Sequence, residues 1–298
     1  MPVHDELGLR IKNNYEKIPQ TKLMRRCPVI VRCDGKAFHS WTRGFKRPFD
    51  EVLVKSMQDT MKYLCENIMG SVCGYTQSDE LTLVLIDYQK HTSQAFFDYE
   101  VQKLCSIIAS MATMAFNKAF LDNVDIAYHE EFYKLGLDNE NNFKSKEEYN
   151  EIADDLEKKY DIYYNKVGTA MFDCRCFNVP KEEVTNAIYW RQLDATRNSI
   201  QMVGQANFSH TELQNKSCND IQDMLMLQKG INWNDFPTHL KRGSCCIKET
   251  YYPDPKPGYE NCDIDATTAR TRWIVDKEIP IFKGEGREYI DKLVFVGE

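Results

Sequence analysis

The chain has 298 residues, of which 42% are hydrophobic and 28% are charged, and its formal net charge is −7. This balance is typical of a chain that buries a sizeable core, which argues against wholesale disorder and against fibrous structure. The longest uncharged apolar stretch, residues 104–117, is shorter than the roughly 20 residues that cross a bilayer, so we expect no membrane partner. The start, MPVHDELGLRIKNNYEK, lacks the apolar centre of a secretory signal, so we expect an intracellular, cytoplasmic location, with an organelle left open.

The acidic excess is concentrated in one segment. Residues 121–166 contain 13 acidic side chains and six lysines, whereas the remaining 252 residues contain 32 charges of each sign. The rest of the chain can therefore form local basic patches for a nucleic-acid partner. The 11 cysteines include no Cys-x-x-Cys pair, so we expect reduced, mostly buried thiols and no zinc or redox motif.

The apolar spacing predicts a sheet-and-helix unit in the first 180 residues. The predicted elements, in chain order, are a short amphipathic helix over 5–18, a strand over 27–33, a helix over 50–68, a hairpin of strands 72–76 and 81–87, a helix over 93–120 and a strand over 170–180. The order strand, helix, hairpin, helix, strand is that of a ferredoxin-like, split βαβ sheet. We therefore expect an α+β fold.

The acidic segment interrupts this unit between its second helix and its last strand. We predict a catalytic domain over 1–180 with an acidic insertion at 121–166, helical over 145–160 and otherwise facing solvent. Residues 181–298 are predicted to form a mainly helical C-terminal part that packs on the first domain. Its helices are expected over 181–205 and 217–229, and its strand-like runs over 240–249 and 273–282.

Carboxylates are expected to meet where two of these strands end. In a ferredoxin-like sheet the first strand is central, so Asp34 at its end can face Asp79 and Glu80 in the hairpin turn. Carboxylates held close together repel one another unless a divalent cation neutralises them, and magnesium prefers such oxygen ligands. Taken singly, each signal also fits a structural role, because an Asp-Gly pair after a strand commonly forms a turn and a Ser-Asp-Glu run can be a solvated hairpin tip.

The sequence around these carboxylates adds groups that suit a nucleotide. Lys36, His39 and Arg47 could meet a triphosphate, and Phe38 could pack on a base. For His39, a packed histidine among aromatic residues is the competing interpretation.

Two blocks of this sequence resemble the tRNA-His guanylyltransferase superfamily, whose members extend RNA in the 3′-to-5′ direction. They are VIVRCDGKAFHSWTRGFKRPFDE (29–51) and GYTQSDELTLVL (74–85), and the similarity continues through FDCRCFNVP, YWRQLDATRNSI, FSHTELQNKS and LKRG. The resemblance implies a polymerase-type palm domain, two Mg2+ ions, ATP and GTP as substrates, and tRNA as partner. It also implies a homotetramer built as a dimer of dimers, with the C-terminal part contacting RNA.

The resemblance also implies roles for individual residues. The metal ligands would be Asp34, the carbonyl of Gly35 and Asp79, with Glu80 as a further catalytic carboxylate. Nucleotide binding is implied for Asp34, Gly35, Lys36, Ala37, Phe38, His39, Arg47, Ser78, Asp79 and Lys103. Contacts with RNA or with its activated 5′ end are expected for Arg175, Arg191, Asn198, Lys241 and Arg242.

Several of these positions have a second interpretation in the sequence alone. Arg191 could pair with Asp194 on a helix face, and Asn198 could cap a local turn. Lys241-Arg242 could simply begin a strand. Trp190, between these motifs, is expected in the core.

One segment distinguishes two branches of the superfamily. Members dedicated to tRNA-His carry His-x-Asn-Asn-Leu-Tyr-Asn after Trp-Arg-Gln-x-Asp, whereas this chain has TRNSIQM at 196–202, with Thr196 and Gln201 at the histidine and tyrosine positions. The segment is similar to that of the guanylyltransferase-like proteins, which repair truncated tRNA 5′ ends by template-directed pairing. We favour that activity over a dedicated tRNA-His guanylyltransferase. A nucleotidyl cyclase with the same palm and a non-catalytic RNA-binding protein remain alternatives.

Overall fold

A six-stranded antiparallel sheet lies at the centre of the computed structural model, which describes residues 5–252 and 269–295. The strand order is β4-β1-β3-β2-β5-β6. The strands are β1 Val29–Gly35, β2 Ser71–Gln77, β3 Glu80–Leu85, β4 Phe172–Asn178, β5 Ser244–Tyr251 and β6 Arg270–Asp276. In the first four strands, β1 pairs with both β3 and β4, which is the predicted ferredoxin-like arrangement. The predicted α+β fold is therefore confirmed.

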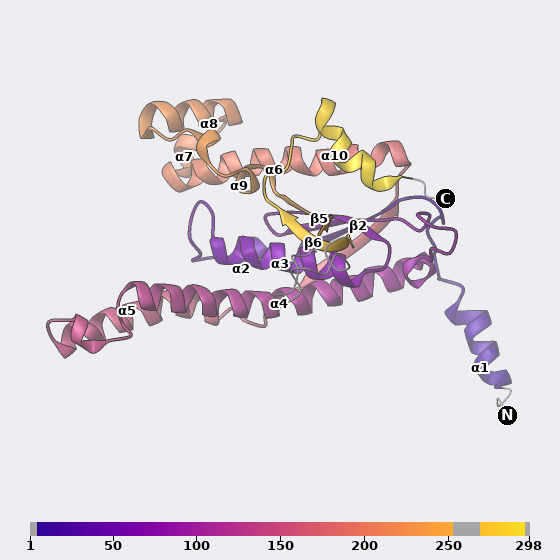
Figure 1. Cartoon of the computed structure of the whole chain (residues 1–298), viewed down its shortest axis with the longest axis horizontal. Helices are drawn as coiled ribbons and strands as arrows, with labels where there is room; N and C mark the ends of the chain where they lie inside the picture. The colour runs from indigo at the N-terminus through magenta and orange to yellow at the C-terminus, as the bar shows by residue number, and fades with distance from the viewer. Residues whose placement is uncertain (1–4, 253–268, 296–298) are drawn as a thin grey trace, which may run out of the picture.

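Ten α-helices accompany the sheet in the described part of the chain (Figure 1). They are α1 Glu6–Ile11, α2 Phe38–Trp41, α3 Glu51–Asn67, α4 Val101–Lys134, α5 Lys146–Tyr164, α6 Val184–Asn207, α7 His210–Leu213, α8 Cys218–Met224, α9 Thr238–Arg242 and α10 Glu288–Asp291. Helices α3 and α4 pack against each other and cover one face of the sheet, while α6 packs against the other face. Alternation in β1 explains the two layers, since Val31 joins the α3–α4 core and Ile30 joins the α6 core.

The predicted helix over 93–120 has a different start and end in the structure. It begins at Val101 and continues to Lys134, well into the acidic segment. Nothing in residues 121–134 breaks a helix, and Gly136, with a φ of +72°, is the first residue suited to end one. By length and composition, α4 is the one helix among the described residues that could cross a membrane. Here its inner side, including Leu104 and Phe116, packs in the core with α3 and β4.

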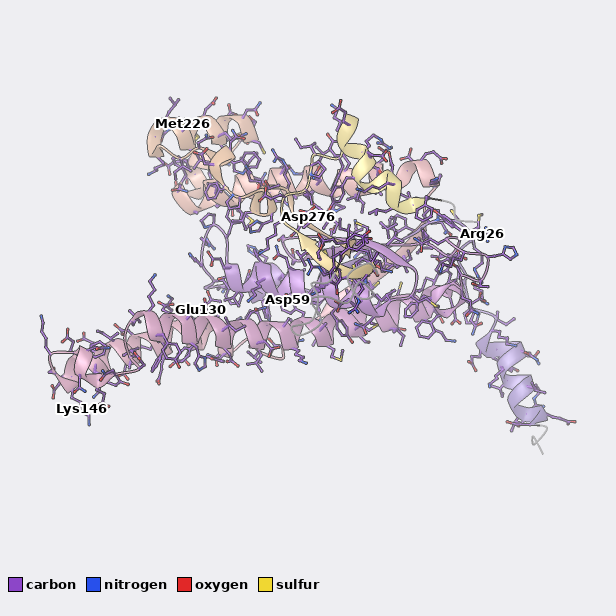
Figure 2. The ribbon with its side chains drawn as sticks, viewed as in Figure 1. Arg26, Asp59, Glu130, Lys146, Met226 and Asp276 are labelled. Carbon is purple, nitrogen blue, oxygen red and sulfur yellow. The ribbon has the colours of Figure 1, made fainter. Side chains whose placement is uncertain are left out.

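The acidic segment forms a helical arm together with the end of α4. Helix α5 confirms the predicted helix over 145–160, and Figure 2 shows Glu130 and Lys146 on this arm, both exposed. The prediction that the rest of the segment faces solvent is wrong, because Val124 and Leu137, which lie outside 145–160, are buried in the core. Leu156, Tyr160 and Tyr163 repeat at helical spacing and are buried against the palm core. Those apolar positions were hidden by the surrounding charges in the sequence.

The C-terminal residues complete the palm sheet and also form helices. Strand β5 pairs with β2, and β6 pairs with β5, so the boundary proposed at residue 180 divides the sequence but not the sheet. The strand expected over 273–282 ends at Asp276. After it, Ile279 and Phe282 pack beneath α6, where the Gln192 side chain accepts a hydrogen bond from the Phe282 amide at 2.9 Å.

The predicted N-terminal helix is present as α1 and a following π-turn. Its residues are all outside the core, and Figure 1 shows α1 projecting from the body of the molecule.

Candidate active site

The structure brings Asp34, Gly35, Asp79 and Glu80 together at one end of the central strands. Asp34 is paired with Glu80 across β1 and β3, and the Gly35 amide donates to the Asp79 carbonyl at 3.0 Å. Ser78 has a φ of +49°, which lets the chain reverse between β2 and β3 within two residues. Residues that are more than 40 positions apart in sequence therefore share one site, as expected from the strand order.

The carboxylate pair at this site suits a divalent cation. Burial raises the pKa of Asp79, a hydrogen bond from the Ser78 hydroxyl opposes that rise, and the charge of Asp34 adds to it. Two neighbouring carboxylates therefore repel each other, and a cation would relieve the repulsion. No cluster of three or more His, Cys, Asp or Glu side chains that could hold a metal occurs within residues 5–252 and 269–295. A magnesium ion would thus rely on two side chains, backbone carbonyl oxygen and substrate phosphates.

Glu80 forms an ion pair with an arginine of helix α6, on the other face of the sheet. The Arg191 Nε donates to Glu80 Oε1 at 2.6 Å, and another guanidinium nitrogen donates to Asp194 at 2.8 Å. Burial raises the pKa of Glu80, and the positive charge of Arg191 opposes the rise. Because Arg191 is only 8% exposed, its predicted contact with RNA is contradicted by its position. The alternative pairing with Asp194 is confirmed.

A cavity of about 360 Å3 opens beside the carboxylates, lined by His39, Arg47 and Asp79 among others. His39 is exposed, so the interpretation as a packed histidine is wrong, and Lys36 is exposed nearby in sequence. Phe38 borders the cavity, but it is 3% exposed and its ring stacks on Trp41 with centroids 4.8 Å apart. It therefore belongs to the aromatic core and does not offer a free face to a base.

The backbone of this loop requires small residues. A Cβ on Gly35 would lie 2.4 Å from the Phe38 ring, so only glycine fits there. Ala37, with a φ of +56°, starts α2 in the left-handed region. The short turn this allows places Lys36 and His39 just after the end of β1.

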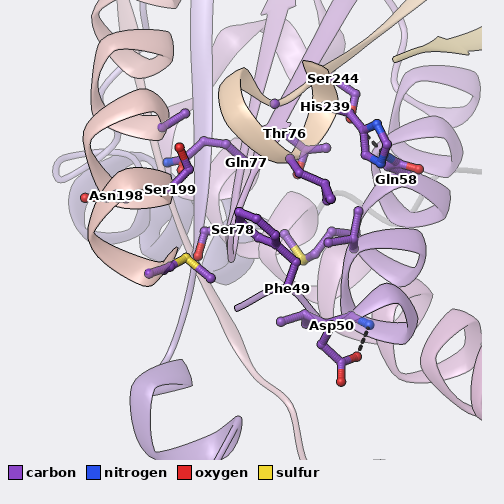
Figure 3. A pocket seen from close by; sticks show the side chains of 17 residues that line it. Phe49, Asp50, Gln58, Thr76, Gln77, Ser78, Asn198, Ser199, His239 and Ser244 are labelled. Carbon is purple, nitrogen blue, oxygen red and sulfur yellow. Dashed lines mark hydrogen bonds between the residues drawn. The ribbon is translucent and has the colours of Figure 1, made fainter. Parts of the chain in front are cut away.

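A second cavity, of about 80 Å3, lies next to the first between α3, β2, α6 and α9 (Figure 3). Asp50 and Ser78 line both spaces, and Asn198 lines the second. Its walls are mainly apolar, with a buried hydrogen bond from the Gln58 amide to the Ser244 hydroxyl at 2.9 Å. His239 also lines it, and burial lowers the pKa of this imidazole. Sequence reasoning did not identify His239, because a histidine in a short helix has no motif of its own.

Other predicted site residues lie apart from the carboxylates. Lys103 is near the start of α4 and pairs with Glu100 at 3.3 Å; two residues further along the helix, Cys105 Sγ is 3.6 Å from Cys176 Sγ. Cys176 lies toward the end of β4, whereas Asp173, near its start, pairs with Asp34, so Lys103 lies away from the carboxylates along the strand direction. The structure does not bring Lys103 to the cavity beside Asp79.

The remaining predicted RNA contacts have mixed positions. Lys241 is 7% exposed and its ammonium donates to the Asn234 carbonyl, which contradicts a contact with RNA. Arg242 is half-buried, and its carbonyl accepts from the Tyr75 hydroxyl at 2.6 Å. Arg175 is exposed and pairs with Asp173 at 3.0 Å.

Trp190 was expected in the core, but it is 54% exposed. Its ring lies against two guanidinium groups, those of Arg191 at 4.4 Å and Arg32 at 5.5 Å from the ring centroid. The indole therefore covers cations on the α6 face of the sheet, which explains how a large aromatic side chain is stable there.

Comparison with known proteins identifies close structural and sequence similarity to one family. The family model described as tRNAHis guanylyltransferase matches residues 10–180. A solved bacterial tRNA(His) guanylyltransferase (Thg1)-like protein in complex with ATP is 37% identical, with a TM-score of 0.73, over 98% of this chain and 100% of that chain. The GTP complex of a bacterial protein with the same description is 35% identical, with a TM-score of 0.69 over the same shares. The tRNA(His) guanylyltransferase of Saccharomyces cerevisiae is 23% identical over 76% of this chain and 85% of its own.

Proposed function

Because this chain belongs to the tRNAHis guanylyltransferase family, we propose that it is a magnesium-dependent enzyme that adds nucleotides to tRNA 5′ ends in the 3′-to-5′ direction. Members of this family are nucleotidyltransferases, and this chain is a tRNA guanylyltransferase-like nucleotidyltransferase. The observation that carries the proposal is the strand end that brings Asp34 and Gly35 next to Asp79, which lines the adjoining cavity.

The residues at the site fit the proposed cation and substrates. Asp34 and Asp79 would hold magnesium, with the Gly35 carbonyl, and the ion when bound would offset the negative charge of the phosphates. His39 and Arg47 are exposed and line this cavity, where they would orient a triphosphate, and the exposed Lys36 lies three residues before His39 in the sequence. Arg191 holds Glu80 in place and keeps its charge from adding to the repulsion between the two aspartates. The ATP and GTP complexes of the bacterial relatives support both nucleotides as substrates.

The proposed reaction has two transfers. A 5′-monophosphate oxygen of the RNA first attacks the α-phosphate of ATP, and pyrophosphate leaves. The 3′-hydroxyl of the incoming nucleotide then attacks the activated 5′ phosphate, the new phosphodiester forms, and AMP leaves. A 5′-triphosphate end would need no activation, because it already has pyrophosphate as a leaving group.

Template-directed repair is the branch that we favour. Residues 196–202 depart from the pattern of dedicated tRNA-His enzymes, and Asn198 in that segment lines the second cavity. The greater identity with the bacterial (Thg1)-like proteins, 37% and 35%, than with the yeast tRNA(His) guanylyltransferase, 23%, supports the same branch. We also propose the homotetramer implied by the resemblance, which light scattering of the purified protein would test.

The decisive experiment uses 5′-monophosphorylated tRNA, full-length or one nucleotide short, with magnesium and each labelled nucleoside triphosphate in turn. We expect addition to the shortened tRNA only of the base that pairs with the opposite strand. Guanylate addition restricted to full-length tRNA-His would identify the dedicated enzyme instead, and cyclic nucleotide formed without RNA would identify a cyclase. Asp34→Asn and Asp79→Asn should each abolish addition while the protein stays folded; full activity in either variant would exclude this site.

A further inference from the structure

A groove of about 500 Å3 leads away from the cavity beside Asp79, between the loop that follows α2 and helices α6 and α7. Figure 1 shows this loop rising toward those helices. His39, Arg47 and Gln205 line both the groove and the nucleotide cavity, so the two spaces are continuous. Any chain that leaves the active site in this direction would pass along the groove.

The polar side chains that line this groove are cationic or neutral. His39 and Arg47 come from the palm, while His210 and Lys216 come from α7 and the turn that follows it. No carboxylate lines the groove within the described residues. Two carboxylates close by in sequence are engaged locally: Glu212 accepts from Ser209, and Asp220 accepts from Ser217. Hydrogen bonds from Ser217 lower the pKa of Asp220, and the charge of Lys216 lowers it further.

The four basic side chains of the groove are exposed. In residues 5–252 and 269–295, none of them has a carboxylate oxygen within 4 Å of its nitrogen atoms. Arg47 and Lys216 are the charged members of this set, and exposed cations on a concave surface focus a positive potential there. The groove is therefore attractive to polyanions although the chain as a whole is acidic.

We propose that this groove binds the phosphate backbone of the RNA end that enters the active site, with His210 and Lys216 as contacts beyond the nucleotide cavity. The proposal rests on the proposed function. A single nucleotide already has the cavity next to Asp79, whereas the groove offers additional space of similar size and continues from it. Phosphates give such contacts most of their affinity, and RNA adds hydroxyls and unstacked base edges.

Three glutamines make the groove suitable for those additional groups. Gln201, Gln205 and Gln214 line it, and each side-chain amide can both donate and accept a hydrogen bond. Gln201 also stands where dedicated tRNA-His enzymes carry tyrosine in the motif described above. The sequence departure that distinguishes the two branches therefore lies on the wall of the proposed RNA path.

The test measures RNA affinity over a series of salt concentrations for the full-length protein and the variant His210→Ala/Lys216→Ala. Each lost phosphate contact should reduce the slope of log affinity against log salt by about 0.7 to 0.9. We expect weaker tRNA binding and a smaller slope, with GTP affinity measured without RNA unchanged. Lys158→Ala is the control, because Lys158 lies on the exposed arm in α5 and its loss makes a similar change in net charge. It should leave the slope unaltered.

The outcomes separate this proposal from the proposed function. An unchanged RNA affinity and salt slope in the double variant would overturn the groove, even if the enzyme still extends tRNA. A loss of GTP affinity alone would also overturn it, because the groove would then serve the nucleotide. Asp34→Asn should keep wild-type RNA affinity and its salt slope while losing catalysis. If the wild-type protein binds tRNA but adds no nucleotide, the proposed function fails, and the salt series still tests the groove.

Discussion

Tyr163 links the acidic arm to the loop that lines the nucleotide cavity. Its hydroxyl donates to Asp50 Oδ2 at 2.6 Å, and its ring stacks on Phe45 with centroids 4.7 Å apart. Asp50 is buried, caps the start of α3 through the Leu53 amide at 2.9 Å, and accepts from the Lys46 amide at 3.0 Å. Tyr163 thus stabilises a carboxylate that fixes both ends of the segment from Lys46 to α3.

Replacing Tyr163 with phenylalanine removes this hydrogen bond and leaves the stacked ring. A hydrogen bond to a charged group contributes about 1.5–3 kcal/mol, so Tyr163→Phe should lower the free energy of unfolding by that amount. In urea unfolding the midpoint should fall without a change in the slope m. Because the cavity residues Lys46 and Arg47 belong to the loop that Asp50 holds, the KM for the nucleotide should rise more than kcat falls.

Tyr160→Phe provides a matched control on the same helix. The Tyr160 hydroxyl donates to Glu131 at 3.0 Å within the arm, outside the lining of the nucleotide cavity. This variant should lose stability while the nucleotide KM stays at the wild-type value. A Tyr163→Phe protein with wild-type stability and wild-type KM would refute the reasoning. Equal increases in KM for both variants would show that the arm acts only through global stability.

Three further predictions concern buried charges and the exposed side of the arm. Arg191→Met leaves the buried Glu80 without its partner and should lower the free energy of unfolding by about 3–5 kcal/mol. The double variant Arg191→Met/Glu80→Gln should restore most of this loss, and chemical denaturation of both variants measures it. The folded state lowers the pKa of His239 below its unfolded value. The neutral ring therefore contributes stability that is complete above a pH of about 6.5 and is lost below it. His239→Gln should flatten the decline in unfolding free energy between pH 7.5 and 5.5, and an unchanged decline would contradict this. Asp154→Asn/Asp155→Asn should leave tRNA affinity unaltered if the exposed arm points away from the RNA, whereas a clear gain in affinity would place it beside the bound stem.

Local patterns in the sequence were sufficient to predict the fold and the proximity of the carboxylates at the site. The β-branched run over 27–33 predicted a strand, and the polar residues 77–80 between two β-rich runs predicted a hairpin. Strand order then placed Asp34 near Asp79 and Glu80. Asp50 at the head of an amphipathic run predicted the start of α3, where it is now seen as the cap. Each of these features depends on residues close in sequence or on a sheet topology with few alternatives.

Contacts between layers were not predictable in the same way. Arg191 and Trp190 are neighbours on α6, yet the charged side chain is buried and the aromatic one is exposed. This inversion follows from Glu80 on the sheet beneath, which compensates a buried guanidinium, and from two arginines on which the indole can lie. Neither Glu80 nor Arg32 is recognisable as a partner from the sequence around α6, so Trp190 was wrongly expected in the core, and only the pairing of Arg191 with Asp194 was foreseen.

The distribution of charge has a functional consequence that the net value conceals. The acidic side chains of residues 121–166 lie on an arm whose Tyr163 bonds Asp50 in the loop before α3, while the exposed Arg47 of that loop and Lys216 line the groove. The insertion can therefore support the active site through Tyr163 without placing its carboxylates in the groove. If repulsion of RNA by the arm were important, raising the salt concentration would strengthen tRNA binding; because cations in the groove dominate, we expect it to weaken binding.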